Sequence, residues 1–165
     1  MENNFDTIVA IITPQAQSAV SIIRLSGDMS YEISQSIFNK KIKPKMINYG
    51  HIIHNDKVID EVILLPFKAP HSYTGEDVVE IQTHGSLAIV NEVLDIILSK
   101  GARLAQRGEF TKRAFLNHRI DLSQAEAVLD VINSKSIKSA QNSLNNLGGY
   151  LKNKINEVKE DLIKL

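Results

Sequence analysis

The sequence contains no cysteine, and this absence excludes several classes of protein. Without thiols there is no disulfide scaffold, no cysteine-ligated zinc or iron–sulfur site and no thiol nucleophile. A chain without cysteine is compatible with a reducing compartment. The acidic start, Met1-Glu2-Asn3-Asn4-Phe5-Asp6, has none of the positive charge of a signal peptide. We therefore expect a soluble, cytoplasmic protein.

The sequence also lacks an excess of charge and a long apolar run. Nineteen basic residues balance nineteen acidic ones, so there is no global field that attracts nucleic acid or a membrane surface, and only local patches remain. Its apolar runs are far shorter than the roughly 18 residues of a membrane span, and we expect no membrane partner.

Common catalytic and nucleotide-binding motifs are missing as well. The 165 residues contain neither GxGxxG nor GxxxxGK[ST], and no nucleophile elbow with a Ser-His-Asp order. The chain therefore has no usual means of cradling a nucleoside triphosphate, and we assign it no catalytic residue.

What is present indicates an α+β protein with a mixed β-sheet. With 43% hydrophobic residues the chain can bury a core. β-Branched or alternating runs predict strands, and apolar residues at helical spacing predict helices. The predicted strands are 7–13, 19–25, 49–53, 58–65, 78–83 and a short one at 102–105. The strands 49–53 and 58–65 flank His54-Asn55-Asp56-Lys57, which predicts a β-hairpin. The predicted helices are 87–99 and 109–117, with a looser helical stripe from Tyr31 to Phe38.

Beyond residue 118 only helical signals remain. Ser123 and Glu126 fit a capping box, and Gly148-Gly149 predicts a kink or break in the helix that follows. Its apolar stripe continues to the last residue without a stop signal; it comprises Leu144, Leu147, Leu151, Ile155, Val158, Leu162 and Leu165. We expect residues 1–118 to form one domain and residues 119–165 to begin a helical domain whose remainder is missing.

Three groups of polar residues have a structural interpretation that outweighs a functional one. His51, His54 and Asp56 suggest a metal site, but strand alternation places the two histidines on opposite faces, so we predict no metal. His84 is a candidate general base, although a loop histidine without a Ser or Cys partner is more often a hydrogen-bonded turn residue. The lysines around Pro44 are more typical of a solvated loop than of a nucleic-acid patch.

The densest polar constellation lies in two loops, 73–80 and 107–113, together with Arg24 in an otherwise apolar strand. These residue types suit a flat heteroaromatic ligand with a carboxylate tail. A carboxylate such as Glu80 accepts from ring N–H groups, Arg24 or Arg113 grips an acid, and Tyr73 or Phe110 stacks. The alternative is structural: Glu76, Asp77, Glu109 and Arg113 form surface ion pairs and a helix cap.

Several blocks of sequence resemble the amino-terminal region of the MnmE (TrmE) family of tRNA-modifying GTPases. They occur in order along nearly the whole chain: 6–10 with Thr13-Pro14, 22–27, Ser72-Tyr73-Thr74-Gly75-Glu76-Asp77-Val78-Val79-Glu80 with His84-Gly85, Arg107-Gly108-Glu109-Phe110-Thr111-Lys112-Arg113 continuing to Asn117, and 121–127. The resemblance implies an aminomethyltransferase-like folate-binding fold over the first part of the chain.

The resemblance also implies a function. Members of the family form homodimers and bind a tetrahydrofolate derivative, 5-formyl- or 5,10-methylene-tetrahydrofolate, near the dimer interface. With the flavoprotein MnmG they add an aminomethyl-type group to the wobble uridine of certain tRNAs. GTP, Mg²⁺ and K⁺ bind a GTPase domain that these 165 residues do not contain, so we expect no GTP hydrolysis from them.

For this chain we predict a cofactor site rather than a catalytic one. Arg24 is assigned to a ligand acid or ring oxygen and Glu80 to pterin N–H groups. The loop over the ligand comprises Tyr73, Thr74 and Gly75, with Phe110 and Arg113 as supporting stack and anchor. One departure counts against folate: the turn at 15–19 reads Gln-Ala-Gln-Ser-Ala where the family is usually glycine-rich. The alternative function is therefore a ligand-free dimerisation or scaffold module.

Overall fold

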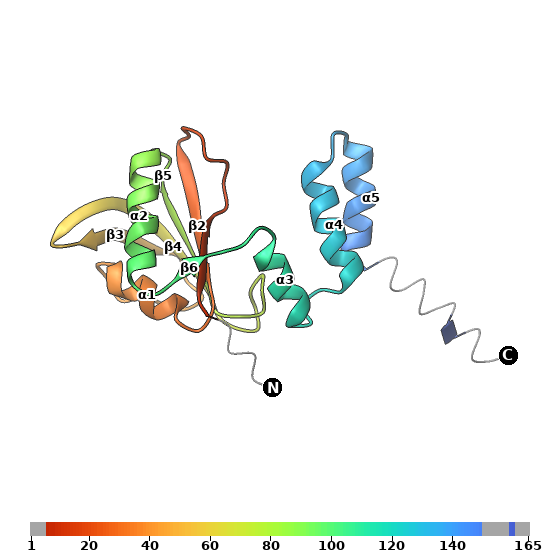
Figure 1. The fold of residues 1–165 in the computed structure, drawn as a ribbon, viewed down its shortest axis with the longest axis horizontal. Helices are drawn as coiled ribbons and strands as arrows, with labels where there is room; N and C mark the ends of the chain where they lie inside the picture. The colour runs from red at the N-terminus through yellow and green to blue at the C-terminus, as the bar shows by residue number, and fades with distance from the viewer. Residues whose placement is uncertain (1–5, 150–158, 161–165) are drawn as a thin grey trace. The chain divides into compact units, whose positions relative to one another are not determined.

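The computed structural model describes residues 6–149 and 159–160, and the chain forms two compact units, Met1–Arg113 and Ala114–Leu165. The predicted domain boundary at residue 118 stays a prediction beside this division. The first unit is built on a six-stranded sheet (Figure 1). Its strands are β1 (Ile8–Ile11), β2 (Val20–Ser26), β3 (Asn48–His54), β4 (Lys57–Phe67), β5 (Val78–His84) and β6 (Arg103–Leu104).

The sheet is mixed, which confirms the predicted α+β class. The strand order is β3-β4-β5-β2-β1-β6, and every neighbouring pair is antiparallel except β1 and β6, which run parallel. The two-residue turn Asn55-Asp56, with both residues at positive φ, closes the predicted β3–β4 hairpin. The edges of the strands differ from the predicted ones because pairing, rather than local sequence, decides where a strand ends.

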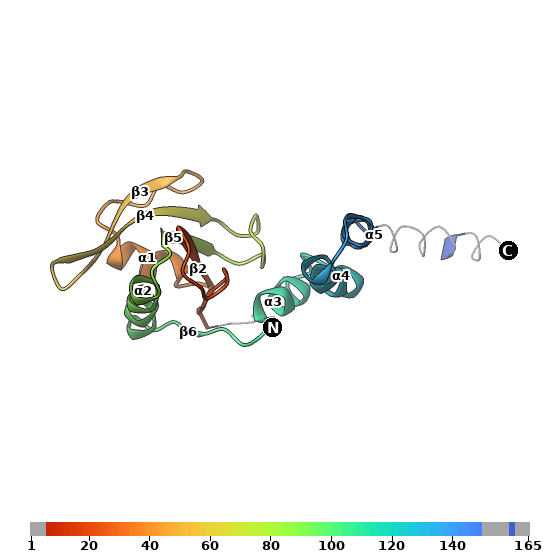
Figure 2. The same ribbon diagram turned by 90° about the horizontal axis from the view of Figure 1, so that it is seen from above.

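Two helices cover one face of this sheet, α1 (Ser30–Ile37) and α2 (Leu87–Ser99) (Figure 2). Alternate strand residues such as Ile23, Leu25 and Ile81 point to that face and are fully buried, because successive side chains of a strand point to opposite sides. Val93 and Ile97 of α2 complete the core. The predicted bounds of α2 are confirmed.

The other face is called the open face here. It carries the alternate residues of the central strands, which are partly accessible to solvent; among them are Ile22, Arg24, Ile63, Leu65 and Glu80. The third helix of the chain, α3 (Glu109–Leu116), follows the short strand β6. The open face therefore combines polar and apolar side chains.

The second unit contains α4 (Leu122–Asn133) and α5 (Ile137–Leu147), and its capping differs from the prediction. Asp121, not Ser123, is the N-cap of α4: its carboxylate accepts from the Gln124 N–H, and the Gln124 side chain accepts from the Asp121 N–H, both at 2.9 Å. The box therefore lies two residues earlier than predicted, because aspartate and glutamine fill it as well as serine and glutamate do.

The predicted break at Gly148-Gly149 is confirmed, since α5 ends at Leu147 and Gly148 caps it. The predicted stripe residues from Leu151 to Val158, and Leu162 and Leu165, lie outside the described residues. Over the parts of the chain that are described, no helix has the length and apolar character that crossing a membrane requires.

Candidate functional site

Arg24 and Glu80 form an ion pair on the open face of the sheet. They are directly opposite each other in the antiparallel pairing of β2 and β5, and cross-strand partners present their side chains on the same face. The Arg24 Nε atom donates to Glu80 Oε1 at 2.8 Å, and Arg24 Nη2 lies 2.6 Å from the same oxygen. The two side chains keep 19% and 16% of their surface exposed, so solvent and a ligand can reach them.

Two aromatic rings flank the Arg24 guanidinium. Its central carbon lies 5.0 Å from the ring centre of Tyr73 and 5.5 Å from that of Phe110. Tyr73 comes from the loop before β5 and Phe110 from the first turn of α3. The Tyr73 hydroxyl is 2.8 Å from the hydroxyl of Thr111, which fixes the ring to α3. The sequence analysis missed Thr111, because nothing in the local pattern indicates that its hydroxyl meets a residue 38 positions away.

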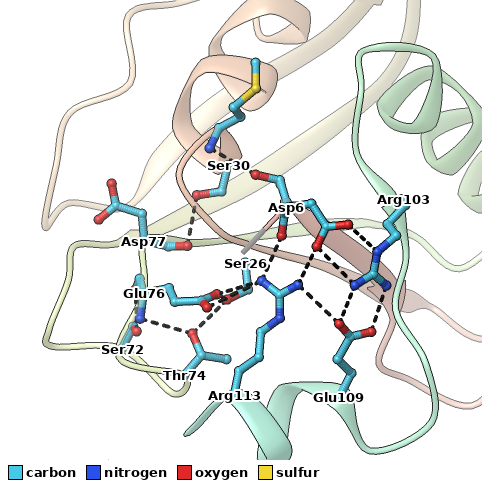
Figure 3. Close-up of polar contacts among 12 residues, drawn as sticks. Asp6, Ser26, Ser30, Ser72, Thr74, Glu76, Asp77, Arg103, Glu109 and Arg113 are labelled. Atoms are coloured by element: carbon cyan, nitrogen blue, oxygen red, sulfur yellow. Dashed lines mark hydrogen bonds and ion pairs between the residues drawn. The ribbon is translucent and has the colours of Figure 1, made fainter. Parts of the chain in front are cut away.

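The loop that carries Tyr73 is tied to the sheet by buried hydroxyl groups. The Ser26 hydroxyl lies 2.7 Å from the Thr74 hydroxyl and donates to Glu76 Oε2 at 2.7 Å (Figure 3). Thr74 is completely buried, and Gly75 adopts φ +80°, a conformation that glycine enters without steric cost. Thr74 and Gly75 therefore shape the loop from within rather than from its exposed side.

Arg113 is held by the protein's own oxygens. With 2% of its side chain exposed, it donates to the Asp6 carbonyl at 2.8 Å and to Asp6 Oδ1 at 3.0 Å, and its Nη atoms lie 3.2 Å from Glu109 and 3.3 Å from Glu76. Figure 3 shows the guanidinium between these acidic groups. The ion pairs of the structural alternative are thus present. Those of Glu76, Glu109 and Arg113 are largely buried, whereas Asp77 pairs with the exposed Lys68.

Arg103 extends this network and lowers the pKa values of two of the carboxylates in the network. Its guanidinium contacts both Asp6 and Glu109, with Nη2 2.6 Å from Glu109 Oε1. The hydrogen bond from Arg103 is the main cause that lowers the pKa of Glu109 to about 2, assisted by the Gln106 N–H and Arg113 against the opposing effect of burial. Arg103 likewise lowers the pKa of Asp6, and the two carboxylates raise the pKa of Arg103.

His84 is a hydrogen-bonded residue, as the structural interpretation of the sequence expects. Its Nδ1 lies 2.7 Å from Asp60 Oδ1, and its backbone N–H donates to Asp60 Oδ2 at 2.8 Å. The hydrogen bond and charge of Asp60 raise the pKa of His84. His51 instead lies 3.6 Å from Glu61. Within the described residues, no three metal-ligating side chains come together.

Of the seven predicted site residues, the structure brings Arg24, Glu80, Tyr73 and Phe110 into one cluster. Thr74, Gly75 and Arg113 lie behind this cluster as its support. In chemical terms, the fold presents a partly exposed ion pair between aromatic rings on a sheet face. This arrangement can hold a planar polar ligand, and none of its groups is an activated nucleophile.

The fold is that of an α+β protein with a mixed six-stranded sheet, and comparison with known proteins identifies its family. A family model described as "GTP-binding protein TrmE N-terminus" matches residues 7–119. The chain belongs to this family, which confirms the resemblance predicted from the sequence blocks.

Curated relatives agree with this assignment. Proteins named tRNA modification GTPase MnmE are 48% identical over 163 residues in Streptococcus thermophilus, 45% over 168 in Lactococcus lactis subsp. cremoris and 50% over 165 in Lactiplantibacillus plantarum. These matches cover 96–99% of the chain but only 36–37% of each relative. The chain thus spans little more than a third of the relatives' length.

Proposed function

We propose that the first unit binds a tetrahydrofolate derivative on its open face and forms a homodimer, as part of a tRNA-modifying GTPase. One observation carries the folate proposal: a partly exposed arginine–glutamate pair flanked by two aromatic rings. A pterin presents the complementary chemistry, because it is a flat ring system edged with N–H donors and a carbonyl oxygen. Bound 5-formyl- or 5,10-methylene-tetrahydrofolate would supply a one-carbon unit to the modification reaction.

The atoms left over by the Arg24–Glu80 pair fit this ligand. Both contacts from Arg24 fall on Glu80 Oε1, so Oε2 makes no hydrogen bond to any described residue and can accept from a ring N–H. Tyr73 and Phe110 offer faces for stacking, and the Ser26–Thr74–Glu76 contacts hold the Tyr73 loop in place before a ligand arrives. Arg113 supports this loop through Glu76.

The unusual turn at 15–19 does not count strongly against folate, because it contacts the other end of β2. A Cβ added at Gly85 would lie 2.1 Å from the Ser18 carbonyl oxygen, so the turn packs against the residue after β5. Arg24 lies four residues further along β2 than Val20, a distance of roughly 13 Å along a strand. The turn therefore meets the sheet beside Val20 and not beside Arg24.

The assembly and partners belong to the same proposal. The names of the relatives support a place in tRNA modification. Half-exposed apolar residues on the open face, including Tyr49 and Ile63, support association with a second copy. We further propose that the whole protein acts in the cytoplasm with the flavoprotein MnmG on tRNA, with GTP, Mg²⁺ and K⁺ bound outside these 165 residues.

A ligand-free scaffold is the second candidate function, and one observation favours it. Arg24 and Glu80 neutralise each other, so the pair needs no ligand for its charge balance. In this case the domain would dimerise through its open face and bind no folate.

Calorimetric titration with 5-formyltetrahydrofolate separates the two candidates. We expect saturable binding, weakened about 10- to 100-fold in Arg24→Ala and in Glu80→Gln, because each removes a charge-assisted hydrogen bond to the ligand. Glu92→Gln is the matched control, as Glu92 is an exposed carboxylate of α2, the helix on the opposite face, and its loss should leave affinity unchanged. Unchanged affinity in the Arg24→Ala/Glu80→Gln double variant would contradict the assigned roles. If light scattering shows a wild-type dimer and titration shows no folate binding, the scaffold function is supported instead.

A further inference from the structure

A second feature of the first unit is a cavity of about 430 Å³ at the end of β4. Its floor is apolar and comes from Leu65, Pro66 and Phe67 at the end of β4, with Ile47 before β3. Lys45, Lys68 and His71 lie around it. The cavity thus combines an apolar floor with a cationic rim, and neither the family assignment nor the pterin contacts give it a role.

The cavity and the ion pair are next to each other on one row of the sheet. Leu65 is the cross-strand partner of Glu80, and Glu80 is the partner of Arg24. Directly paired residues share a face, and neighbouring strands are about 4.8 Å apart. A ligand held at Glu80 therefore needs to extend by only one strand to pass over Leu65 into the cavity.

The segment before β3, which contributes Lys45 to the cavity, carries charge of one sign. Between Glu32 and Asp56 the chain has four lysines (Lys40, Lys41, Lys43 and Lys45) and no carboxylate. Lys68, the other lysine that lines the cavity, forms an ion pair with Asp77. Its side chain is nevertheless 58% exposed, and its ammonium group has further N–H donors. Lys45 is exposed, and it makes no ion pair with a described residue. The rim therefore favours an anion.

The turn that presents Lys45 is fixed from beneath by Asn48. This buried amide accepts from the Lys43 N–H at 2.7 Å and donates to the carbonyls of Met46 at 2.8 Å and Lys43 at 3.1 Å. Lys45 itself adopts φ +59°, which the amide contacts stabilise. The backbone of the turn that presents Lys45 is therefore held in one conformation.

We propose that this cavity binds the aminobenzoyl-glutamate tail of the same folate, including additional γ-linked glutamates. The inference rests on the proposed function. The benzoyl ring matches the apolar floor in shape and polarity, and the glutamate carboxylates match Lys45 and Lys68. The ligand class is accordingly a polyglutamylated tetrahydrofolate, with its pterin at Arg24 and Glu80 and its anionic tail across β4.

The test compares 5-formyltetrahydrofolate carrying one glutamate with the form carrying five, by calorimetric titration of the same chain. We expect the pentaglutamate to bind about tenfold tighter or more at low ionic strength, and this preference to shrink in salt as exposed charges are screened. Lys45→Gln and Lys45→Gln/Lys68→Gln should bring the ratio of the two dissociation constants towards one. Lys57→Gln, at the far hairpin turn, is the control and should preserve the ratio.

The outcomes separate the inference from the function on which it rests. Equal affinity for the two folates in the wild-type chain, or a preference that survives in Lys45→Gln/Lys68→Gln, would overturn the tail site and leave the pterin site standing. Binding of neither folate would overturn the proposed function itself. Because both lysines are exposed, circular dichroism should show folded variants, and Lys45→Gln alone leaves the Lys68–Asp77 pair intact.

Discussion

The role of Arg113 depends on the residues that surround its side chain. In the sequence it is one of several cations near an aromatic residue, and ligand binding and ion pairing are both open to it. In the structure it is almost fully buried among Asp6, Glu76 and Glu109. Removing one member of such a network leaves the others unpaired, which commonly costs about 3–5 kcal/mol. Arg113 is therefore primarily a stabilising residue of the folded domain.

At the same scale, the titration of Glu109 predicts a loss of stability in acid. Its pKa is about 2 in the folded domain against an ordinary 4.5, so the stabilisation is complete above pH 4.5 and is lost as the pH falls towards 2. A shift of this size corresponds to about 3 kcal/mol. Urea unfolding between pH 5 and pH 3 should show the fall, and Asp6, whose pKa is also lowered, acts in the same direction.

The matched variant is Glu109→Gln, which should be less stable at neutral pH and show a shallower dependence below pH 4.5. His84 does not obscure the result. Its raised folded pKa gives stability that is complete below pH 6.5 and is lost only as the pH rises through the folded value. Parallel curves for wild type and Glu109→Gln would assign the acid sensitivity to other groups.

At the scale of elements, the helix α4 illustrates a feature that is visible in the sequence but ambiguous in position. Both Asp121-Gln124 and Ser123-Glu126 have the spacing of a capping box. The structure uses the earlier pair, and Ser123 donates at 2.7 Å to the Asp121 carboxylate instead of capping the helix itself. The helix therefore begins at Leu122.

This assignment predicts that Asp121→Ala destabilises α4 by about 1 kcal/mol, because the Gln124 N–H loses its acceptor and the negative charge at the N-terminus disappears. Glu126→Gln is the control and should stay within about 0.5 kcal/mol, since Glu126 is exposed. Thermal unfolding followed by far-ultraviolet circular dichroism measures both. A larger effect of Glu126→Gln than of Asp121→Ala would restore the later box.

At the scale of the whole molecule, the two units differ in how much they bury. The first has a continuous apolar core between the sheet and the helices α1 and α2. In the second, α5 has no buried residue and α4 buries only Ala127, while Ile132 and Ile137 are 73% and 80% exposed. Local stability follows buried apolar contact.

We therefore expect amide hydrogens of α4 and α5 to exchange with solvent on the order of 100-fold faster than those of α2 in the same chain. Hydrogen exchange followed by mass spectrometry provides the measurement, and α2 is the internal control because its apolar face lies in the core. Equal protection in α2 and α5 would show that the exposed side chains of α5 are covered in solution.

Several elements and part of the candidate site can be predicted from local sequence. Local periodicity predicts the bounds of α2, the β3–β4 hairpin and the helical character after residue 118, because burial on one side imposes a repeat that neighbouring residues share. Residue chemistry singles out Arg24, Glu80, Tyr73 and Phe110. These predictions need no knowledge of distant neighbours.

Which of these residues contact one another depends on the packing of distant segments. Arg24 and Glu80 are 56 positions apart, and Asp6 and Arg113 are 107 apart. Thr111, Asn48 and Asp60 carry no signal of their role, because each acts on a partner chosen by strand register or loop path. A side chain's type sets what it can bind, whereas strand order and pairing fix what lies within a hydrogen bond's reach of it.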